Sequence, residues 1–424
     1  MTKPLKNKDY IEKDLKYCAH NYKPLPVALS RGEGVYVWDV EGRRYFDFLC
    51  GYSSNNQGHC HPRILKAFLE QSMKITQTSR AFHNDQMGPA CEYLTKTLGY
   101  DKFLPMNSGA EAGETAVKLA RRWGYVKKGI PADQAKVVVM EGNFWGRTIT
   151  ASGACDDPSR YENFGPFTPG FPMVPFNDIP AIKKLFEADK TIAAIMLEPI
   201  QGERGVIIPD KGYLTQVKKL CREHNVLMIL DEIQTGFGRT GKLMAYEWDQ
   251  DSKPDILAVG KALSGGFLPV SGAFCDDHIM LNIKPGDHGS TYGGNPLAMA
   301  TAKAAIQTLV EEGMPENALH MGEILGDELS KIKSPIIKDT RGRGLFRAVE
   351  VAHDGHVNGN DFAYILMKLG LLTKATHNYS LRLAPALIIE EDQVREAAET
   401  IREGVKVLEQ LNKERSVEKG KRSN

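Results

Sequence analysis

Two short apolar stretches, each ending at a chemically reactive side chain, constrain the fold of this chain more than any other feature. Val226 to Leu230 leads into Asp231, and Ile256 to Gly260 leads into Lys261. Similar stretches alternate with segments of helical periodicity from about residue 62 to residue 298; two more are Lys136 to Met140 and Ile192 to Leu197. This alternation predicts an α/β fold with a mainly parallel sheet flanked by helices. Because ligands bind where the carboxyl ends of such strands meet, we expect Asp231 and Lys261 to share a site.

The chemistry of this pair favours one cofactor. A lysine removed from water has a lowered pKa and can attack a carbonyl as a neutral amine. An aspartate beside it can hold the proton of a pyridinium nitrogen, and pyridoxal phosphate requires both groups. The residues alone leave open a simpler interpretation, in which Lys261 is one of 54 basic residues and Asp231 caps a helix. A nucleotide-binding P-loop is excluded, since Ala262 stands where that motif needs serine or threonine.

The composition predicts an enzyme that acts on small molecules. The 424 residues are enough for two or three domains, and 42% of them are hydrophobic, which allows sizeable cores. The formal net charge is +1, and charges of both signs are spread along the chain. Because neither a nucleic-acid-binding stripe nor a polybasic membrane patch stands out, we expect no nucleic-acid or membrane partner.

The seven cysteines indicate a reducing compartment, because they are odd in number and scattered without a CxxC pair. The cluster His59-Cys60-His61 is interpreted as a turn ahead of Pro62, because adjacent residues do not easily aim at one ion, and we expect no metal. The N-terminus lacks the apolar core of a signal peptide. No stretch approaches the roughly 20 apolar residues of a membrane span. We therefore expect a cytoplasmic protein.

Four regions are expected along the chain. Residues 1–61 form an N-terminal segment with a β-hairpin, whose short turn is Val40-Glu41-Gly42. Residues 62–297 form the large cofactor-binding domain. Residues 298–412 form a small α+β C-terminal domain with two helices, a strand, a helix, a second strand around Leu381 to Leu383 and a last helix from Glu391. Residues 413–424 are charged, with Val417 as their apolar residue, and are expected to be disordered.

A run of small residues precedes a predicted helix from Glu111 to Gly124. Ser108, Gly109 and Ala110 leave the backbone N–H groups at the helix start unhindered, and the helix dipole adds positive potential. This pattern is typical of a phosphate site. An ordinary capped helix has the same appearance, so the tripeptide alone does not separate the two.

Aromatic and charged side chains follow other predicted strands. After the strand that ends at Met140, Phe144 is placed to stack on a flat cofactor ring. Arg147 is placed to clamp a substrate carboxylate through two parallel N–H bonds. The alternatives are a core phenylalanine and a surface ion pair. Glycine-rich polar loops at residues 198–203 and 288–296 are of the kind that line a site.

Taken together, these residues and their order resemble the class-III, fold-type-I aminotransferases that use pyridoxal phosphate, from about Tyr17 to Leu411. Within that family the likeness is strongest to the members that act on ornithine. The segments that carry it are Ala19 to Pro26, Asn143 to Thr148, Glu198 to Glu203 and Gly289 to Pro296. The resemblance implies a fold-type-I transferase with a large domain and a small C-terminal domain. It also implies a homodimer or higher homo-oligomer with its sites at the interface.

The resemblance further implies the cofactor contacts. Lys261 forms the internal aldimine with pyridoxal 5'-phosphate, and Asp231 pairs with the pyridine nitrogen. Gln234 contacts the ring hydroxyl, and Phe144 stacks on the ring. The phosphate is held by Ser108, Gly109 and Ala110, helped by Ser290 and Thr291 reaching over from a second subunit.

The implied reaction is ping-pong. Ornithine gives its δ-amino group to the cofactor and leaves as glutamate 5-semialdehyde; 2-oxoglutarate then takes the amine and leaves as glutamate. Lys261 moves the proton. Glu203 covers Arg382 in the first half-reaction and swings off in the second, when Arg382 binds the α-carboxylate of 2-oxoglutarate. The implied substrate-binding residues are Tyr22, Tyr52, Arg147, Glu203 and Arg382.

Three points stay open from sequence. Arg204 stands where the family usually has a small residue, and this cation competes for Glu203 unless it points to the opposite face. Two other amine donors, N-acetylornithine and 4-aminobutyrate, are alternatives within the family. Tyr22 discriminates among the donors, since its hydroxyl suits the free α-amino end of ornithine. A protein that binds the cofactor without catalysis is an alternative of a different class.

Overall fold

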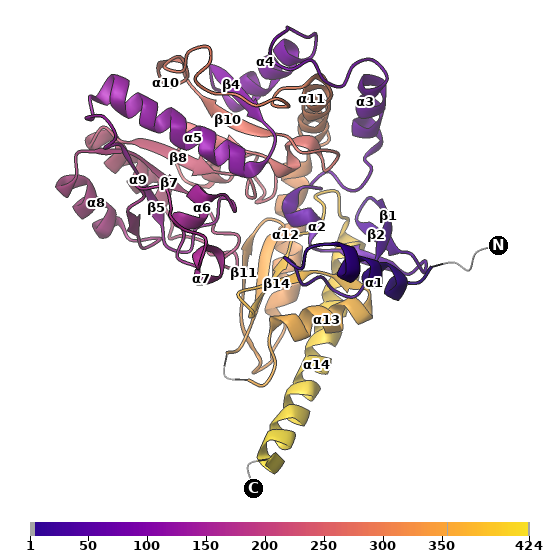
Figure 1. Cartoon of the computed structure of the whole chain (residues 1–424). Helices are drawn as coiled ribbons and strands as arrows, with labels where there is room; N and C mark the ends of the chain where they lie inside the picture. The colour runs from indigo at the N-terminus through magenta and orange to yellow at the C-terminus, as the bar shows by residue number, and fades with distance from the viewer. Residues whose placement is uncertain (1–4, 354, 423–424) are drawn as a thin grey trace.

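The computed structural model describes residues 5–353 and 355–422, and its centre is a sheet of seven strands (Figure 1). The strand order is β4-β10-β9-β8-β7-β5-β6. The strands are β4 Lys102–Met106, β5 Lys136–Met140, β6 Met173–Val174, β7 Ile192–Leu197, β8 Leu227–Asp231, β9 Ile256–Val259 and β10 Ser271–Cys275. β10 runs antiparallel to both of its neighbours, and the other pairs are parallel. The predicted mainly parallel sheet is therefore confirmed.

Helices cover both faces of this sheet (Figure 1). The helices of this region are α3 Pro62–Ser72, α4 Met87–Leu98, α5 Gly109–Trp123, α6 Ile149–Gly153, α7 Pro158–Tyr161, α8 Ile179–Ala188, α9 Tyr213–Glu223, α10 Asp277–Met280 and α11 Pro296–Glu311. Val137 and Val139 of β5 belong to the core on the side of α5, whereas Val138 and Met140 belong to the core on the side of α9. A strand buried on both faces appears in the sequence as a continuous apolar run. The burial of both faces therefore accounts for the continuous apolar runs from which the central strands were predicted.

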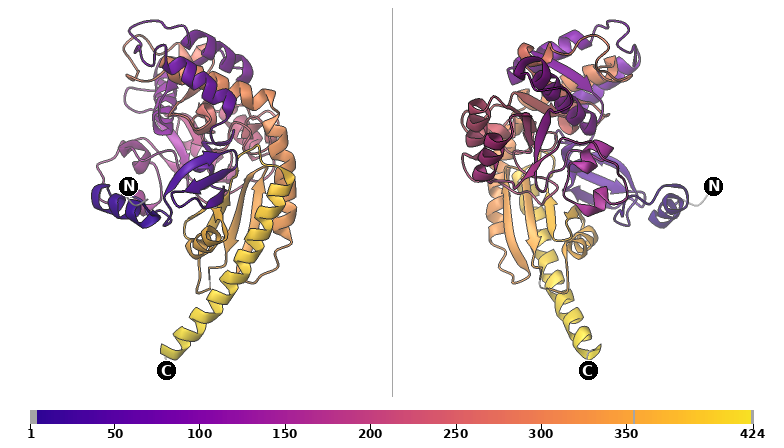
Figure 2. Two further views of the ribbon diagram at one scale, coloured as in Figure 1. Left: turned by 90° about the vertical axis from the view of Figure 1, so that its right-hand side faces the viewer. Right: turned by 60° about the vertical axis from the view of Figure 1, so that its left-hand side comes forward.

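The C-terminal region adds a four-stranded antiparallel sheet in the order β11-β12-β15-β14, with long helices beside it (Figure 2). Its elements are α12 Met314–Ser330, β11 Ile337–Arg343, β12 Phe346–Val351, α13 Gly359–Leu369, β13 Leu371–Leu372, β14 Lys374–Thr376, β15 Ser380–Leu383 and α14 Glu391–Arg422. The predicted strand around Leu381 and the predicted last helix from Glu391 are both present. β15 carries Arg382 into the interior of the molecule.

The N-terminal region carries the predicted hairpin. β2 Tyr36–Asp39 and β3 Arg44–Asp47 pair antiparallel, and β1 Leu29–Glu33 adds a third strand. β13 completes this sheet, because Leu371 and Leu372 run parallel to Phe46 and Asp47. α1 Asn7–Tyr17 projects from this end of the molecule (Figure 2). The hydrogen bonds of β13 thus join segments more than 300 residues apart.

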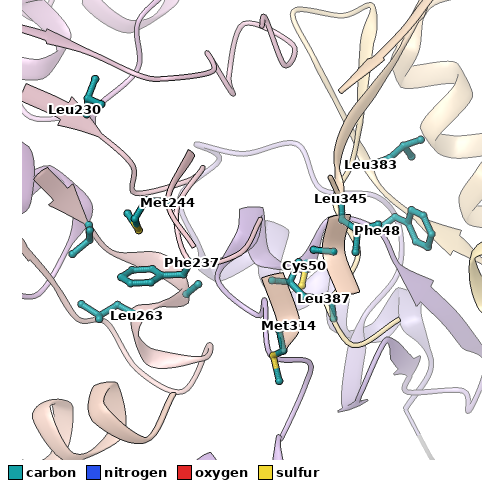
Figure 3. Close-up of a cluster of buried hydrophobic side chains, with 14 of the residues drawn as sticks. Phe48, Cys50, Leu230, Phe237, Met244, Leu263, Met314, Leu345, Leu383 and Leu387 are labelled. Atoms are coloured by element: carbon teal, nitrogen blue, oxygen red, sulfur yellow. The ribbon is translucent and has the colours of Figure 1, made fainter. Parts of the chain in front are cut away.

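One hydrophobic core connects the three regions (Figure 3). Its buried side chains include Leu230, Phe237, Met244 and Leu263 from the large sheet region, Met314, Leu345, Leu383 and Leu387 from the C-terminal region, and Phe48 and Cys50 from the N-terminal region. Because this core is continuous, the C-terminal region is held against the part of the sheet that carries the ends of β8 and β9.

The expectation of a disordered tail is wrong for residues 413–422, which continue α14 as a helix to Arg422 (Figure 1). Arg415 donates two hydrogen bonds to the carboxylate of Asp361 in α13, at 2.8 and 2.9 Å, and a third to the carbonyl of His356 at 3.0 Å. A bidentate arginine–carboxylate pair is a directional contact that composition does not reveal. Residues 423 and 424 lie outside the described residues.

The cysteines and the His59-Cys60-His61 cluster make no covalent link and no metal site in the described ranges. All seven cysteines are unpaired. The Nε2 atom of His59 lies 2.8 Å from Asp47, and that of His61 lies 3.1 Å from Glu312, so the two rings face different carboxylates. Over residues 5–353 and 355–422, no group of three or more His, Cys, Asp or Glu side chains could hold a metal ion. Within those same ranges, no helix is long and apolar enough to span a membrane.

Candidate active site

Asp231 and Lys261 lie on one cavity at the carboxyl edge of the sheet. β8 and β9 are parallel neighbours, and Asp231, the last residue of β8, is in register with Ala258 of β9. Lys261 follows Gly260 at the end of β9 and begins a 3₁₀ turn, η3 Lys261–Ser264. Both side chains line a cavity of about 210 Å³. The structure therefore brings together the two residues that the strand ends predicted.

The buried surroundings shift the pKa values of both Asp231 and Lys261. Burial raises the pKa of Asp231 to about 6, although a 3.0 Å hydrogen bond from the Ile233 amide and the Lys261 charge oppose the rise. Burial lowers the pKa of Lys261, which the charges of Glu203 and Asp231 partly counteract. Lys261 also has a φ of +45°, in the left-handed region that residues with a side chain rarely adopt. Strain of this kind is typical of functional positions.

The N-terminus of α5 forms one corner of the cavity. The Ser108 hydroxyl accepts a hydrogen bond from the Glu111 amide at 3.3 Å, and the Glu111 carboxylate accepts one from the Ser108 amide at 2.8 Å. This capping box leaves the amides of Gly109 and Ala110 without an intrahelical acceptor. Gly109 and Ala110 line the cavity. An anion at this corner meets two N–H donors and the positive end of the helix dipole.

The segment after β5 forms a second wall. Phe144 and Trp145 line the cavity. The guanidinium carbon of Arg160 lies 4.8 Å from the centre of the Phe144 ring, and that of Arg147 lies 5.8 Å from it. Arg147 itself is exposed, where a substrate carboxylate can reach it. The buried side chain of Gln234 completes the wall beside Asp231.

Glu203 and Arg382 form an ion pair near this cavity. The Nη1 atom of Arg382 lies 2.5 Å from Oε1 of Glu203, and 3% of the Arg382 side chain is exposed. Burial favours the neutral acid, but the charge and hydrogen bond of Arg382 outweigh it and lower the pKa of Glu203. The hydroxyl of Thr376 donates a hydrogen bond to the Glu203 carbonyl. The Glu203 carboxylate thus occupies a hydrogen-bond donor that Arg382 could otherwise offer to another carboxylate.

Two tyrosines lie around this pair. Tyr52, in the short segment α2 Cys50–Ser53, has a φ of +59°, and its ring centre lies 4.8 Å from the Arg382 guanidinium carbon. Burial raises the pKa of Tyr52; Arg382 acts against the rise, while Glu203 and Tyr22 add to it. The Tyr22 side chain is 75% exposed. Tyr22 is thus near Tyr52 but open to solvent.

The Arg204 side chain lies against Gly142, in the loop that follows β5. Its Nη1 atom lies 3.4 Å from Oδ2 of Asp156. A Cβ atom added to Gly142 would lie 2.2 Å from Cδ of Arg204, so the arginine occupies the space left by that glycine. Arg204, the residue after Glu203, therefore has its own acidic partner.

Ser290 and Thr291 lie beside the helix-start corner of their own chain. The Ser290 hydroxyl accepts a 2.8 Å hydrogen bond from the side chain of Asn107, the residue before Ser108. The Thr291 carbonyl accepts a 2.8 Å bond from Gln77. Ser290 is half-buried and Thr291 is exposed. Neither residue lines the cavity that contains Lys261.

Glu198 is a cavity residue that was expected only as part of a site-lining loop at residues 198–203, with no role of its own. It directly follows β7 and lines the cavity with Asp231 and Lys261. Burial and the charge of Asp231 raise its pKa to about 8, against the hydrogen bonds from the Gly202 and Phe144 amides. The signal was available, because an acid at the carboxyl end of a buried strand is the same pattern that pointed to Asp231.

A lysine and a buried carboxylate on one cavity, beside the N-terminus of a helix, define an enzyme that uses pyridoxal phosphate. The residues fit this cofactor: Lys261 for its aldehyde, Asp231 for its ring nitrogen and the free amides of α5 for its phosphate. Gly109 leaves the corner open, since a Cβ atom there would lie 3.2 Å from the Ile233 side chain.

Residues 17–405 match the family described as "Aminotransferase class-III". The chain belongs to this family and is a pyridoxal-phosphate-dependent aminotransferase. It is 54% identical to the mitochondrial ornithine aminotransferase of Rattus norvegicus, over 93% of this chain and 89% of that protein. A solved structure of ornithine aminotransferase from Toxoplasma gondii matches with a TM-score of 0.95 and 45% identity, over 97% of this chain and 96% of that one. Acetylornithine aminotransferase from Elizabethkingia anophelis matches with a TM-score of 0.87 and 46% identity, over 95% and 99%.

Proposed function

We propose that this enzyme transfers the δ-amino group of L-ornithine to 2-oxoglutarate, forming L-glutamate 5-semialdehyde and L-glutamate. The observation that carries the proposal is the closed pair of Glu203 and Arg382. An arginine covered by a carboxylate does not attract the α-carboxylate of an amino acid, so the terminal amine of a diamino acid enters instead. The similarity to ornithine aminotransferases from several organisms supports the same substrate.

The cavity residues then divide the work of the first half-reaction. Pyridoxal phosphate, when bound, supplies an electron sink. Lys261, whose pKa is lowered by burial, is the amine placed to hold and move a proton at the substrate carbon. Asp231 would hold the proton of the cofactor's ring nitrogen. Tyr22 and Arg147 hold the distant amino-acid end of ornithine outside the cavity.

The second half-reaction needs the positive charge of Arg382 to be exposed to the substrate. When Glu203 leaves Arg382, the arginine presents its donors to the α-carboxylate of 2-oxoglutarate, and Arg147 binds the γ-carboxylate. Two arginines at fixed positions select a dicarboxylate because each can bind one carboxylate through a bidentate pair. Arg204 supports this switch, since its contact with Asp156 leaves Glu203 free to move.

N-acetylornithine is the rival donor, because the Elizabethkingia acetylornithine aminotransferase is as similar in sequence as several ornithine aminotransferases. A side-by-side assay with 2-oxoglutarate and ornithine, N-acetylornithine or 4-aminobutyrate separates the alternatives. We expect ornithine to be preferred, with the semialdehyde trapped as its cyclised product. Another preferred donor contradicts the assignment. No transfer from any of the three, with the cofactor bound, would support the non-catalytic alternative.

Tyr22 is expected to set part of this preference. Tyr22→Phe removes one hydroxyl, and we expect kcat/KM for ornithine to fall about tenfold, the effect of one hydrogen bond to a charged group. Tyr22→Ile is expected to lose as much and to admit the other donors. The measurement is kcat/KM for each donor, with Tyr10→Phe, in the exposed helix α1, as the matched control. Unchanged ornithine turnover together with no gain by other donors contradicts this role for Tyr22.

We propose a homodimer or higher homo-oligomer in which Ser290 and Thr291 help to bind the cofactor phosphate of the neighbouring subunit. The bond between Gln77 and Thr291 ties two segments that expose large apolar side chains, namely Met73, Phe82 and Tyr292. Exposed apolar side chains that gather on one surface are typical of an interface. Light scattering of the purified holoenzyme is expected to give the mass of at least two chains; the mass of one chain contradicts the proposal.

We also propose the cytoplasm as the compartment of this protein. The seven unpaired cysteines support a reducing environment. Fractionation of cells that express the full chain tests the location, and recovery in an organelle fraction contradicts it.

A further inference from the structure

Glu198 is a buried acid that the reaction described above does not use. Its Oε1 atom accepts a hydrogen bond from the Phe144 amide at 3.2 Å, and its Oε2 atom accepts one from the Gly202 amide at 3.0 Å. The side chain is 6% exposed. Both carboxyl oxygens are therefore used, each by the backbone of a different segment.

These two segments carry the residues that define the site. Phe144 is the side chain placed to stack on the cofactor ring, and Gly202 directly precedes the switch residue Glu203. Gly202 also packs closely on Gln234, because a Cβ atom on Gly202 would lie 1.7 Å from Oε1 of Gln234. The backbone before Glu203 thus has little freedom to shift without disturbing its neighbours. A displacement of Gly202 therefore also displaces Gln234.

We propose that Glu198 is a positioning residue that couples the Glu203 switch to the stacking of Phe144 through its two backbone hydrogen bonds. The inference rests on the proposed function, because it assigns Glu203 the role of the moving charge. When Glu203 leaves Arg382, the Gly202 amide moves with it or strains its bond to Glu198. Because the same carboxyl group also accepts the hydrogen bond from the Phe144 amide, a displacement of Glu198 shifts Phe144, whose side chain lines the cavity.

Substitution of Glu198 by glutamine tests the coupling in the full-length holoenzyme. The amide has nearly the same shape, but its nitrogen cannot accept a hydrogen bond, so one of the two backbone contacts is lost. We expect kcat/KM for ornithine relative to glutamate to fall by up to about tenfold, as expected for one buried hydrogen bond. We also expect the visible circular dichroism of the bound cofactor to change, because residue 198 no longer joins the Phe144 segment to the Gly202 segment. Glu198→Asp, which keeps the acid, serves if the glutamine variant does not fold.

Glu232→Gln is the matched control. Glu232 is fully buried, and its carboxyl oxygens accept hydrogen bonds from the Ala245 and Tyr246 amides at 2.7 and 2.8 Å, but it does not line the cavity. This variant is expected to lower the melting temperature while leaving the donor ratio and the cofactor signal unchanged. A purely structural role for Glu198 predicts the same behaviour in Glu198→Gln, and that result overturns the proposal.

A double-mutant cycle separates this inference from the proposed function. In a Glu203→Ala background, Glu198→Gln is expected to have less than half of its effect on the donor ratio, because coupled residues are non-additive. Additive effects overturn the coupling. Absence of ornithine turnover in the unmodified enzyme overturns the proposed function instead. The same four variants of the cycle are then assayed with the amine donor that the enzyme does use.

Discussion

Replacement of Lys261 by alanine is expected to abolish multiple turnover. No other amine shares the cavity with Asp231 among the residues that line it, and Lys261 is the group whose burial-lowered pKa suits it to bind the cofactor and to move the proton. Loss of a positioned general base alone costs about a hundredfold to ten-thousandfold in rate. We expect the variant to lose the yellow absorbance of the lysine-bound cofactor and nearly all formation of glutamate from ornithine and 2-oxoglutarate.

The control for this experiment is Lys128→Ala. Burial also lowers the pKa of Lys128, to about 8, and its ammonium group donates a 2.7 Å hydrogen bond to the carbonyl of Ile192, at the start of β7. Its loss is expected to reduce stability but to leave the cofactor absorbance and the turnover per folded molecule intact. Retained multiple turnover in Lys261→Ala contradicts the catalytic role of this lysine.

Replacement of Glu203 by alanine is expected to change which end of an amino acid reacts. Arg382 is 3% exposed and has Glu203 as its carboxylate partner, so removal of that carboxylate leaves a buried cation without its counter-charge. The α-carboxylate of glutamate then becomes its best available partner. We expect the first half-reaction with glutamate to accelerate by about ten- to a hundredfold, which corresponds to roughly 1.5–3 kcal/mol for a charge-assisted contact. Ornithine is expected to lose its preference for reaction at the δ-amine.

Single-turnover bleaching of the cofactor absorbance with each amine measures this change directly. Glu328→Ala is the matched control. Glu328, whose side chain is 8% exposed against 21% for Glu203, lies on α12 and binds Arg395 and Arg402 of α14 at 2.8 and 2.7 Å, outside the cavity. Both variants remove an acid from its arginine partners, and only Glu203→Ala should alter the choice of donor. Failure of glutamate to gain in Glu203→Ala contradicts the switch.

Local patterns in the sequence predicted the central strands, the hairpin and the pairing of Asp231 with Lys261 on one cavity. Each of these follows from short-range rules: a doubly buried strand is an uninterrupted apolar run, and parallel strands end at a common edge. The disordered tail was wrong for residues 413–422, because composition reports charge but not the neighbouring helix that supplies Asp361 as a partner for Arg415. Glu198 was predicted only as part of a site-lining loop and received no individual role, although it stands at the end of β7 as Asp231 stands at the end of β8.

The sequence by itself thus determined the order of the elements, the class of chemistry and the placement of Asp231 and Lys261 at one edge of the sheet, because these depend on residue type and on periodicity along the chain. The tertiary structure decided that Arg204 turns to Asp156, that Glu203 closes on Arg382 and that one carboxyl group of Glu198 joins two loops. These contacts depend on directions and distances between segments as many as 179 residues apart. Such geometry is set by the packing of the shared core, which no local stretch of sequence contains.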